Sequence, residues 1–423
     1  MNRIEQDLKL RIPDYLCERI CHTSSSAIRR DGEYVVYWMR TAMRAHENPA
    51  LDVATVVANA LSVPLFVLQT LIDQRPFAND RTHTFAIESM RDVQIELAAR
   101  GVEFAMRVME RRGALKEWSV FQRAALVVTE EMPVAPHRAT SIELIANHPA
   151  CTVDTSCIVP MPLTGRAPER AFRFREETKV LRRERLARTW AQIPPPRSAL
   201  PELDFDPIDL RGMDDDEIAD LVSGRKIDHL VGPVRDTRGG GRHGYRRWTS
   251  FVQTGLSTYA QLRNDPTQKL AVSRMSAYLH LGCVSPFRLA READALGATK
   301  YLDELLVWRE LAWHFCYHTE GIDQYEVLPD WARQTLDEHE GDSRPKRLSW
   351  ESLARGRSGE PLWDVAQRSL LKHGELHNNV RMTWGKAFIG WTESPSDALR
   401  LALDLNHRYA LDGQDPASYD RIL

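Results

Sequence analysis

Three tryptophans in the C-terminal part of the chain have a spacing that suits redox chemistry. Trp384 and Trp391 are seven positions apart, so on a helix they share one face two turns apart, and Trp363 precedes them. Asn406 and Asp412 follow in a polar segment. Indoles close enough to pass electrons, next to side chains able to hold a polar ring cofactor, predict a buried redox centre. The alternative is that the tryptophans are ordinary core residues, because large aromatic side chains are mostly buried for their area.

Two oppositely charged residues, Arg381 and Asp412, could pair close to these tryptophans. A buried pair must serve a purpose, because taking both charges out of water costs free energy. The amide of Asn406 offers a donor and an acceptor without adding charge, so it could hold a ring nitrogen of a cofactor. An exposed polar surface is the alternative for all three residues.

Ser273 and Ser276 precede an apolar helical pattern and resemble a helix-capping sequence. The N-terminus of such a helix exposes backbone N–H groups, which can bind a pyrophosphate. Plain helix capping without a ligand is the alternative.

Glu304 and Trp308 are four positions apart and would be neighbours on a helix. A carboxylate beside an indole can accept hydrogen bonds from the edge of a nucleic-acid base while the ring stacks on that base. The alternative is a surface ion pair, Glu304 with Arg309 or Arg309 with Glu310, beside a half-buried tryptophan.

The composition is that of an ordinary globular protein with more than one domain. The chain has 423 residues, of which 43% are hydrophobic and 27% charged. Its net charge of −3 means that any nucleic-acid site must be a local basic patch. The six cysteines form no Cys-x-x-Cys pair and no zinc-binding spacing, so we expect them to be reduced, in a cytoplasmic protein. We expect no secretory signal and no membrane span, because no apolar run is long enough.

The first part of the chain alternates short apolar runs with stretches of helical periodicity. Strands are predicted at residues 34–38, 64–68, 124–129 and 151–154, and helices at 50–62, 83–111 and 137–147. Strands separated by helices predict a parallel, doubly wound α/β sheet. No Gly-x-Gly-x-x-Gly follows the first strand, which argues against a hydride-transferring dehydrogenase.

The middle of the chain is predicted to connect this α/β unit to a helical one. Residues 163–190 are rich in arginine and predict a solvated helix. Residues 192–242 contain Pro-Pro-Pro, an acidic run and Gly-Gly-Gly, which indicate a linker. Apolar residues at three- and four-residue spacing then predict helices at residues 244–262, 269–281, 286–296, 301–317, 362–373, 376–389 and 396–403.

The predicted organisation has four parts. They are an N-terminal extension (residues 1–30), an α/β domain (31–165), an interdomain helix and linker (166–242) and an all-helical domain (243–423). The sequence shows no internal repeat, and a monomer is the default expectation for the oligomeric state.

Taken together, these segments resemble the photolyase/cryptochrome family, and most of all its class II cyclobutane pyrimidine dimer photolyases. The resemblance runs in the expected order over nearly the whole chain. It is carried by residues 36–40, 48–51, 263–266, 276–282, 304–315, 377–391 and 405–416. It implies an N-terminal antenna domain of the HUP type, which is Rossmann-like, and a C-terminal helical domain that binds a U-shaped FAD.

The resemblance also implies roles for individual residues. The segment that holds the FAD phosphates and ribityl chain is matched by Tyr259, Ser273, Arg274, Met275 and Ser276. Asn264 matches an asparagine near the flavin, Asn406 the asparagine facing flavin N5, and Arg381 with Asp412 the pair beside the flavin ring. An electron-transfer chain is matched, outward from the flavin, by Trp384, Trp363 and Trp391. Glu304 and Trp308 match positions that contact the DNA lesion.

The implied activity is light-dependent repair of UV-damaged DNA. Excited FADH⁻ would donate an electron to a cyclobutane pyrimidine dimer flipped out of the duplex, the ring would split, and the electron would return. The tryptophan chain would serve the photoreduction of oxidised FAD. An antenna pigment such as a deazaflavin or a folate is also implied, and no residue pattern identifies it.

Several alternatives stay open. A cryptochrome-like blue-light flavoprotein would keep the flavin without repair, and a 6–4 photoproduct could replace the cyclobutane dimer as substrate. The family pattern continues beyond Leu423 with a Trp-containing segment that supplies part of the flavin pocket and a second aromatic wall for the lesion. A truncated member that has lost FAD is therefore another alternative. An unrelated nucleotide-binding enzyme is disfavoured by the Trp, Asn and Asp set.

Overall fold

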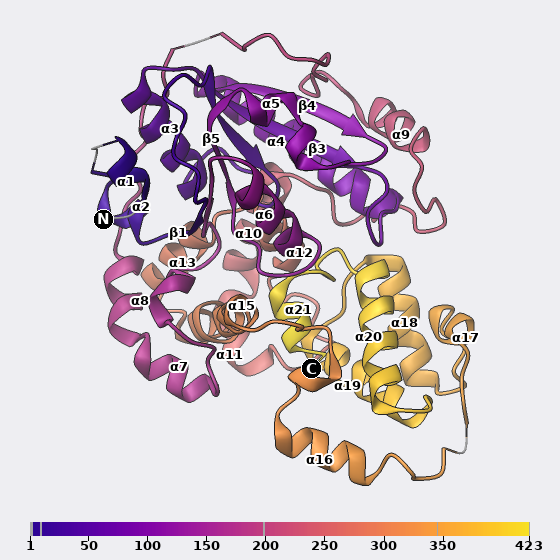
Figure 1. Ribbon diagram of the computed structural model, residues 1–423. Coiled ribbons are helices and arrows are strands. Elements are labelled where there is room, and N and C mark those ends of the chain that lie inside the picture. The colour runs from indigo at the N-terminus through magenta and orange to yellow at the C-terminus, as the bar shows by residue number, and fades with distance from the viewer. Residues whose placement is uncertain (1–2, 9–10, 198, 345, 423) are drawn as a thin grey trace.

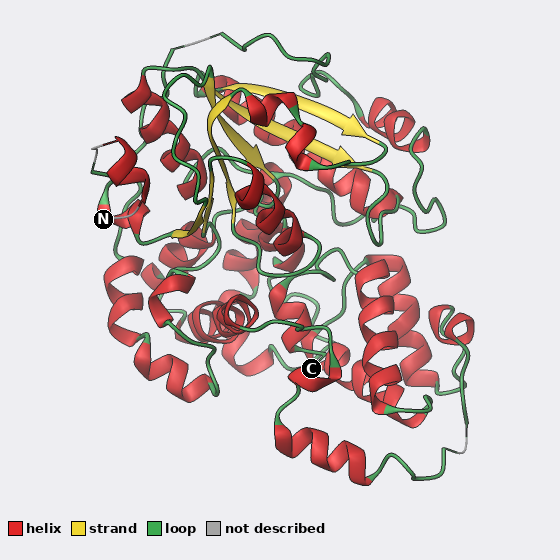
Figure 2. Cartoon of the chain, viewed as in Figure 1, coloured by secondary structure: helices red, strands yellow, loops and turns green. Residues whose placement is uncertain are grey.

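The chain forms an α/β part followed by a helical part, as the computed structural model of residues 3–8, 11–197, 199–344 and 346–422 shows (Figures 1 and 2). The sheet has the strand order β1-β6-β5-β2-β3-β4. Its strands are β1 (Ile20–Thr23), β2 (Tyr34–Met39), β3 (Leu65–Ile72), β4 (Glu103–Met109), β5 (Ala124–Glu130) and β6 (Ala150–Val153). Neighbouring strands are parallel except for β1, which pairs antiparallel with β6. This confirms the predicted doubly wound α/β fold.

Helices cover both faces of the sheet because its central strand is apolar on both sides. One face of β2, with Val35, Tyr37 and Met39, packs in the core shared with α3 (Pro49–Leu61) and α4 (Asp80–Ala99). The other face packs against α5 (Ser119–Gln122) and α6 (His137–Asn147). Because both faces of the sheet are covered, residues at the carboxyl ends of its strands lie on a rigid frame.

Most predicted elements of this domain are confirmed. The four predicted strands correspond to β2, β3, β5 and β6, and the helices predicted at 50–62 and 137–147 correspond to α3 and α6. The helix predicted at 83–111 is wrong in its second half, because α4 ends at Ala99 and residues 103–109 form β4. Gly101 separates the two elements with a left-handed φ of +69°. The predicted N-terminal extension contains β1, while Met1 and Asn2 lie outside the described residues.

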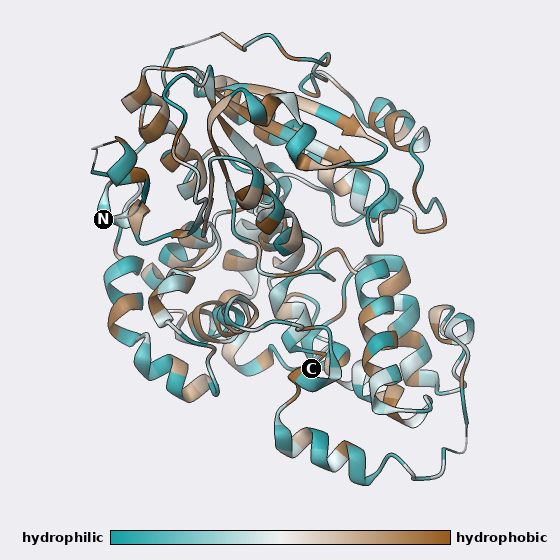
Figure 3. Ribbon diagram, viewed as in Figure 1, coloured by the Kyte–Doolittle hydropathy of each residue, from teal (hydrophilic) through white to brown (hydrophobic). Residues whose placement is uncertain are grey.

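The arginine-rich segment forms two short helices, α7 (Ala171–Glu177) and α8 (Lys179–Leu186). No residue of α8 is buried, as predicted for a solvated helix, and its ribbon is mostly hydrophilic (Figure 3). The predicted linker contains α9 (Asp215–Ser223), which packs against α4.

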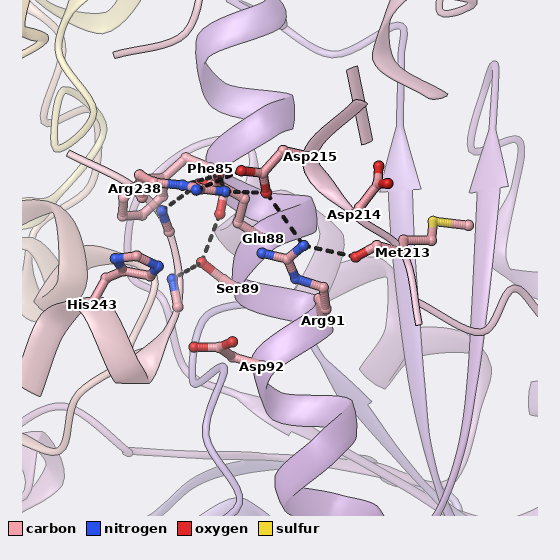
Figure 4. Close-up of polar contacts among 12 residues, drawn as sticks. Phe85, Glu88, Ser89, Arg91, Asp92, Met213, Asp214, Asp215, Arg238 and His243 are labelled. Atoms are coloured by element: carbon pink, nitrogen blue, oxygen red, sulfur yellow. Dashed lines mark hydrogen bonds and ion pairs between the residues drawn. The ribbon is translucent and has the colours of Figure 1, made fainter. Parts of the chain in front are cut away.

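The end of the linker binds to α4 through a set of polar contacts (Figure 4). Arg238 forms ion pairs with Glu88 and Asp215. The backbone N–H groups of Gly239 and Gly240 donate to Glu88 and to the Ser89 hydroxyl. Because α10 (Gly241–Thr254) begins directly afterwards, these contacts fix where the helical domain starts.

The remaining described residues, 255–344 and 346–422, form helices and connecting loops without a strand. The helices are α11 (Tyr259–Leu262), α12 (Ser276–His280), α13 (Pro286–Ala295), α14 (Thr299–Asp303), the π-helical turn η4 (Glu304–Trp308), α15 (Arg309–His318), α16 (Asp330–Glu338), α17 (Trp350–Ala354), α18 (Pro361–His373), α19 (Asn378–Lys386), α20 (Pro395–Tyr409) and α21 (Pro416–Asp420). Within the described parts of the chain, no helix combines the length and apolarity that a membrane crossing needs.

Two predicted helices of this domain are wrong in part. The helix predicted at 244–262 is interrupted at Gly255, which ends α10. Only residues 276–280 of the helix predicted at 269–281 are helical, since Arg274 takes a left-handed φ of +52°. α16, α17 and α21 have no counterpart among the predictions. The other five predicted helices correspond to α13, the α14–α15 segment, α18, α19 and α20.

The two parts of the chain meet at α15, where buried polar groups bind the loop that follows β6. Glu310 accepts hydrogen bonds from the backbone N–H of Ile158 at 2.6 Å and of Val159 at 3.2 Å. The fully buried His314 contacts the Val159 carbonyl through Nε2 at 3.0 Å and the Thr164 hydroxyl through Nδ1 at 2.9 Å. One donor and one acceptor suit a neutral imidazole.

We expect His314 to make the folded protein sensitive to acid. Burial lowers its pKa from 6.5 to about 3, so between these values the unfolded chain binds one more proton than the folded chain. The free energy of unfolding should therefore fall by about 1.4 kcal/mol for each pH unit below 6.5. Urea titrations at several pH values should show that the free energy of unfolding falls less at low pH in His314→Gln than in the wild type. The matched control is His339→Gln, because His339 is exposed, and an unchanged slope in His314→Gln would contradict the expectation.

Candidate functional site

A cavity of about 470 Å³ lies inside the helical part. Its wall is built by the loop between α11 and α12, by α14 and η4, by the α18–α19 connection and by residues 412–421. These segments are far apart in sequence, and the helices to which they belong hold them in place. The cavity is therefore a product of the tertiary fold.

Most residues predicted to hold a cofactor line this cavity. Seven of them do so: Tyr259, Ser273, Arg274, Met275, Ser276, Arg381 and Asp412. Asn264 and Asn406 are not part of the lining. Asn264 is exposed and accepts a hydrogen bond from Arg263, whereas Asn406 is fully buried beside the cavity wall.

The predicted ion pair between Arg381 and Asp412 forms, and both side chains are buried. Arg381 Nη2 lies 2.7 Å from Asp412 Oδ1, with 1% and 6% of the two side chains exposed. Arg381 also donates through Nη1 to the hydroxyl of Ser418 at 2.7 Å. The same hydroxyl accepts from Asn406 Nδ2 at 2.9 Å, so a hydrogen-bonded group joins α19, α20 and α21.

Several buried polar atoms at this cavity have no hydrogen-bond partner within the described residues. They are Nε of Arg381 and Nη2 of Arg309, whose residues line the cavity, and Oδ1 of the adjacent Asn406. Buried polar atoms are nearly always paired, and leaving one unpaired costs about 1–3 kcal/mol. The wall therefore has two unsatisfied donors, with an unsatisfied acceptor beside it, that a polar ligand would satisfy.

The capping role predicted for Ser273 and Ser276 is wrong. α12 has no side-chain cap, and at five residues it is too short to act as a strong anion site. Positive charge comes instead from side chains, because Lys269 and Arg309 line the cavity and neither forms an ion pair with a described residue. Arg274 is already paired, with Asp236 at 3.1 Å and with Glu375, whose pKa is raised by burial.

A larger, more apolar cleft of about 890 Å³ adjoins the cavity. Both hollows share Arg263, Glu304, Asn378, Ala417 and Arg421 in their linings. The indoles of Trp308 and Trp331 also line the cleft, with 44% and 73% of their surfaces exposed. Exposed indoles around a cleft are unusual in a folded protein and indicate a surface that stacks on a ligand.

Glu304 and Trp308 both line this cleft, as the hypothesis of a base-contacting pair requires. The surface ion pairs considered as the alternative do not form. Glu304 pairs instead with Arg263 at 2.7 Å and with Lys300 at 2.8 Å, and Arg309 is buried. The Glu304 carboxylate is thus held at the junction of the cavity and the cleft.

The three tryptophans form one contact array. The Trp363 and Trp384 rings are stacked, with centroids 6.1 Å apart and planes 4° from parallel. Trp391 meets Trp363 edge-on at 5.1 Å. Trp384 is 1% exposed and follows Arg381 by one turn of α19, whereas Trp391 is only partly buried. The array therefore leads from beside the cavity wall toward the surface.

Comparison with known proteins agrees with this geometry. The family model described as DNA photolyase matches residues 35–161. The deoxyribodipyrimidine photo-lyase of Methanothermobacter thermautotrophicus is 31% identical over 405 residues, covering 95% of this chain and 88% of that protein. The chain belongs to the DNA photolyase family.

Solved structures of photolyases have the same fold. A class III photolyase from Agrobacterium tumefaciens superposes with a TM-score of 0.65 at 17% identity, covering 93% of this chain and 79% of that one. An archaeal photolyase from Sulfolobus tokodaii, whose structure holds two FAD molecules, superposes with a TM-score of 0.64 at 16% identity, covering 91% and 81%.

In this photolyase-family chain, the sequence patterns do not identify several residues at or beside the cavity. A surface ion pair is only the alternative that the sequence offers for Arg309, which is buried and lines the cavity. Ser418 and Glu375 were not considered at all, yet they contact Arg381 and Arg274. The position of Ser418 directly after the 405–416 segment was the one available signal.

Proposed function

We propose that this protein is a deoxyribodipyrimidine photo-lyase that splits cyclobutane pyrimidine dimers in DNA with light absorbed by bound FAD. The observation that carries the proposal is the connection of a polar cavity to an indole-lined cleft through Glu304 and Arg263. At this junction a cofactor in the cavity and a nucleic-acid base in the cleft would lie next to each other. The similarity to named photo-lyases over nearly the full chain supports the same activity.

FAD fits the donors of the cavity wall and the acceptor beside it. The unpaired Nε of Arg381 and Nη2 of Arg309 would donate to oxygen atoms of the cofactor, and Asn406 Oδ1 would accept from a ring N–H. Arg381 with Asp412 would orient the ring, and Lys269 beside Ser273 would neutralise the diphosphate. Tyr259, Met275 and Ser276 complete the wall. When bound, FAD supplies the light absorption and the transferable electron.

The aromatic cleft would hold the damaged bases. A dimer stacks poorly in the duplex, so flipping it out costs less than flipping intact bases. Trp308 and Trp331 would stack on the extruded bases, and the Glu304 carboxylate would accept hydrogen bonds from a base edge. Arg263 and Lys300 keep that carboxylate in place.

The tryptophan array would supply electrons that reduce the oxidised cofactor. Contact between Trp384, Trp363 and Trp391 gives an electron a path from the surface to the region of Arg381. This path would serve the photoreduction of oxidised FAD and would play no part in dimer splitting.

A second hollow could hold an antenna pigment. A cavity of about 300 Å³ lies where β2 and β3 end, and it is lined by Trp38, Arg75, Phe85, His280 and Leu411 among others. Ligands of doubly wound sheets bind beyond the carboxyl ends of the strands, at the point where the strand order reverses, which here lies between β2 and β5. His137, which follows β5, also lines the hollow. Arg75 Nε is buried without a partner among the described residues, which suits a pigment with an anionic or carbonyl group.

One experiment tests the proposed function. The purified protein should show a flavin absorption spectrum and should repair thymine dimers in DNA under blue light after reduction. The excitation spectrum would reveal an antenna pigment as an additional band. Bound flavin without repair would indicate a cryptochrome-like photoreceptor, and failure to bind added FAD would contradict the proposal.

We expect Glu304→Ala to slow repair by about ten- to hundredfold, because a hydrogen bond to a charged group contributes about 1.5–3 kcal/mol. The flavin content should not change. Repair by the pre-reduced variant, measured beside its flavin absorbance, checks this expectation. Glu338→Ala, on the exposed face of α16, is the matched control. Loss of flavin from Glu304→Ala would make Glu304 a structural residue instead.

A further inference from the structure

A second group of aromatic rings leads from the cavity wall into the core of the helical domain. Tyr259 and Tyr301 line the cavity, and their ring centroids are 5.3 Å apart. Trp248 of α10 lies 5.2 Å from Tyr301 and is 1% exposed. Within the described chain, no ring contact joins this group to the Trp384 array, so the two groups leave the cavity independently.

The indole N–H of Trp248 faces a base. Nε1 donates to Glu292 Oε2 at 2.6 Å, and the other oxygen of Glu292 accepts from Arg288 at 2.7 Å. The Glu292 side chain is 39% exposed, so a proton that it receives can pass to water.

The two buried indoles of the other array donate to amide oxygens instead. Trp384 Nε1 donates to the amide oxygen of Gln367, and Trp363 Nε1 donates to the backbone carbonyl of Trp384, both at 3.0 Å. Amide oxygens are far weaker bases than a carboxylate. Since an oxidised indole is a much stronger acid than a neutral one, the position of Glu292 matters chiefly if Trp248 is oxidised.

We propose that Trp248 is a second electron donor to the light-excited oxidised flavin, an inference that rests on the proposed function. One electron leaves Trp248 and reaches the flavin across the ring of Tyr301. The Nε1–H bond of Trp248 breaks, and its proton moves to Glu292 Oε2. Trp248 thus loses one electron and one proton, the flavin gains the electron, Glu292 gains the proton, and an added thiol restores Trp248.

Tyr301 would act as a bridge between the cavity and Trp248. Its phenol is buried, and burial raises its pKa, so the hydroxyl keeps its proton in the resting protein. The oxidation ends at Trp248, where the Glu292 carboxylate can accept the proton and slow the return of the electron.

The test uses the full chain with bound FAD, illuminated anaerobically in the presence of a thiol. Trp384→Phe should retain part of the photoreduction rate, and the added change Trp248→Phe should remove it. In the Trp384→Phe background, Glu292→Gln keeps a hydrogen-bond acceptor without the base and should lower the remaining rate about tenfold, or about 1.4 kcal/mol in the barrier. Trp190→Phe, outside both groups, is the matched control and should have no effect.

Transient absorption gives a second measurement that does not depend on repair. In Trp384→Phe, illumination should form a neutral radical on Trp248. In the double variant Trp384→Phe with Glu292→Gln, the Trp248 radical should keep its proton and remain a radical cation. A flavin-loaded Trp384→Phe protein that shows no photoreduction would overturn the inference while leaving the proposed function intact. A residual rate that Trp248→Phe does not alter would overturn it as well. A wild-type protein that binds no flavin would contradict the proposed function itself.

Discussion

Asp412→Ala should release bound flavin and lower the free energy of unfolding by about 3–5 kcal/mol, because it leaves a buried guanidinium without its counter-charge. Arg381 is 1% exposed and has only Asp412 as a carboxylate partner among the described residues. Its remaining polar contact is with the neutral Ser418 hydroxyl. Denaturant titration and flavin absorbance of the same preparations measure both effects.

Two comparisons make this prediction specific. Asp397→Ala breaks an exposed ion pair with Arg400 in the same domain and should cost less than about 1 kcal/mol. The double change Arg381→Met with Asp412→Leu removes both charges and should recover much of the stability without recovering the flavin. Wild-type stability and flavin content in Asp412→Ala would show that the pair supports neither the fold nor the cofactor.

The central strands could be predicted from sequence, and the edge strands could not. β2 and β5 are buried throughout and read as continuous apolar runs. β1 and β4 form the two edges of the sheet, where no residue of β1 is buried and only the middle of β4 is. In β4, Glu103 and Arg107 break the apolar run, and the residues before it belong to a long helix. Local helical periodicity therefore predicts a helix that continues through the residues of β4.

The residues of the candidate site also divide into those that sequence could assign and those that it could not. Arg381 and Asp412 could be paired from sequence, since they carry opposite charges close to tryptophans that are expected to be buried, and a buried charge needs a partner. Arg309 could not be assigned, because its sequence neighbours Glu304 and Glu310 offered plausible local pairs. In the fold, Glu310 binds the backbone of the loop after β6, and Glu304 pairs with Arg263 and Lys300. Most of these contacts join distant parts of the chain, and no local pattern contains them.

Gly239→Ala should destabilise the protein by about 1–3 kcal/mol, because there is no room for a side chain between the linker and α4. A Cβ atom there would lie 2.1 Å from the backbone oxygen of Phe85, 2.8 Å from Ser89 Oγ and 3.0 Å from Glu88 Cβ. The backbone of a long helix cannot swing aside as a flexible side chain can. The linker would have to move instead, breaking the 2.5 Å hydrogen bond from Gly239 N–H to Glu88.

This displacement should be transmitted to the helical domain, because α10 begins two residues later and carries Trp248. Gly212→Ala is the matched control, since Gly212 lies in the same linker and a Cβ atom added to it would meet nothing within 4 Å. It should change the free energy of unfolding by less than about 0.5 kcal/mol. Denaturant titration compares the two variants, and limited proteolysis should cut the linker faster in Gly239→Ala alone. Equal stability and equal cleavage of the two would mean that the linker contacts on α4 do not hold the helical domain in place.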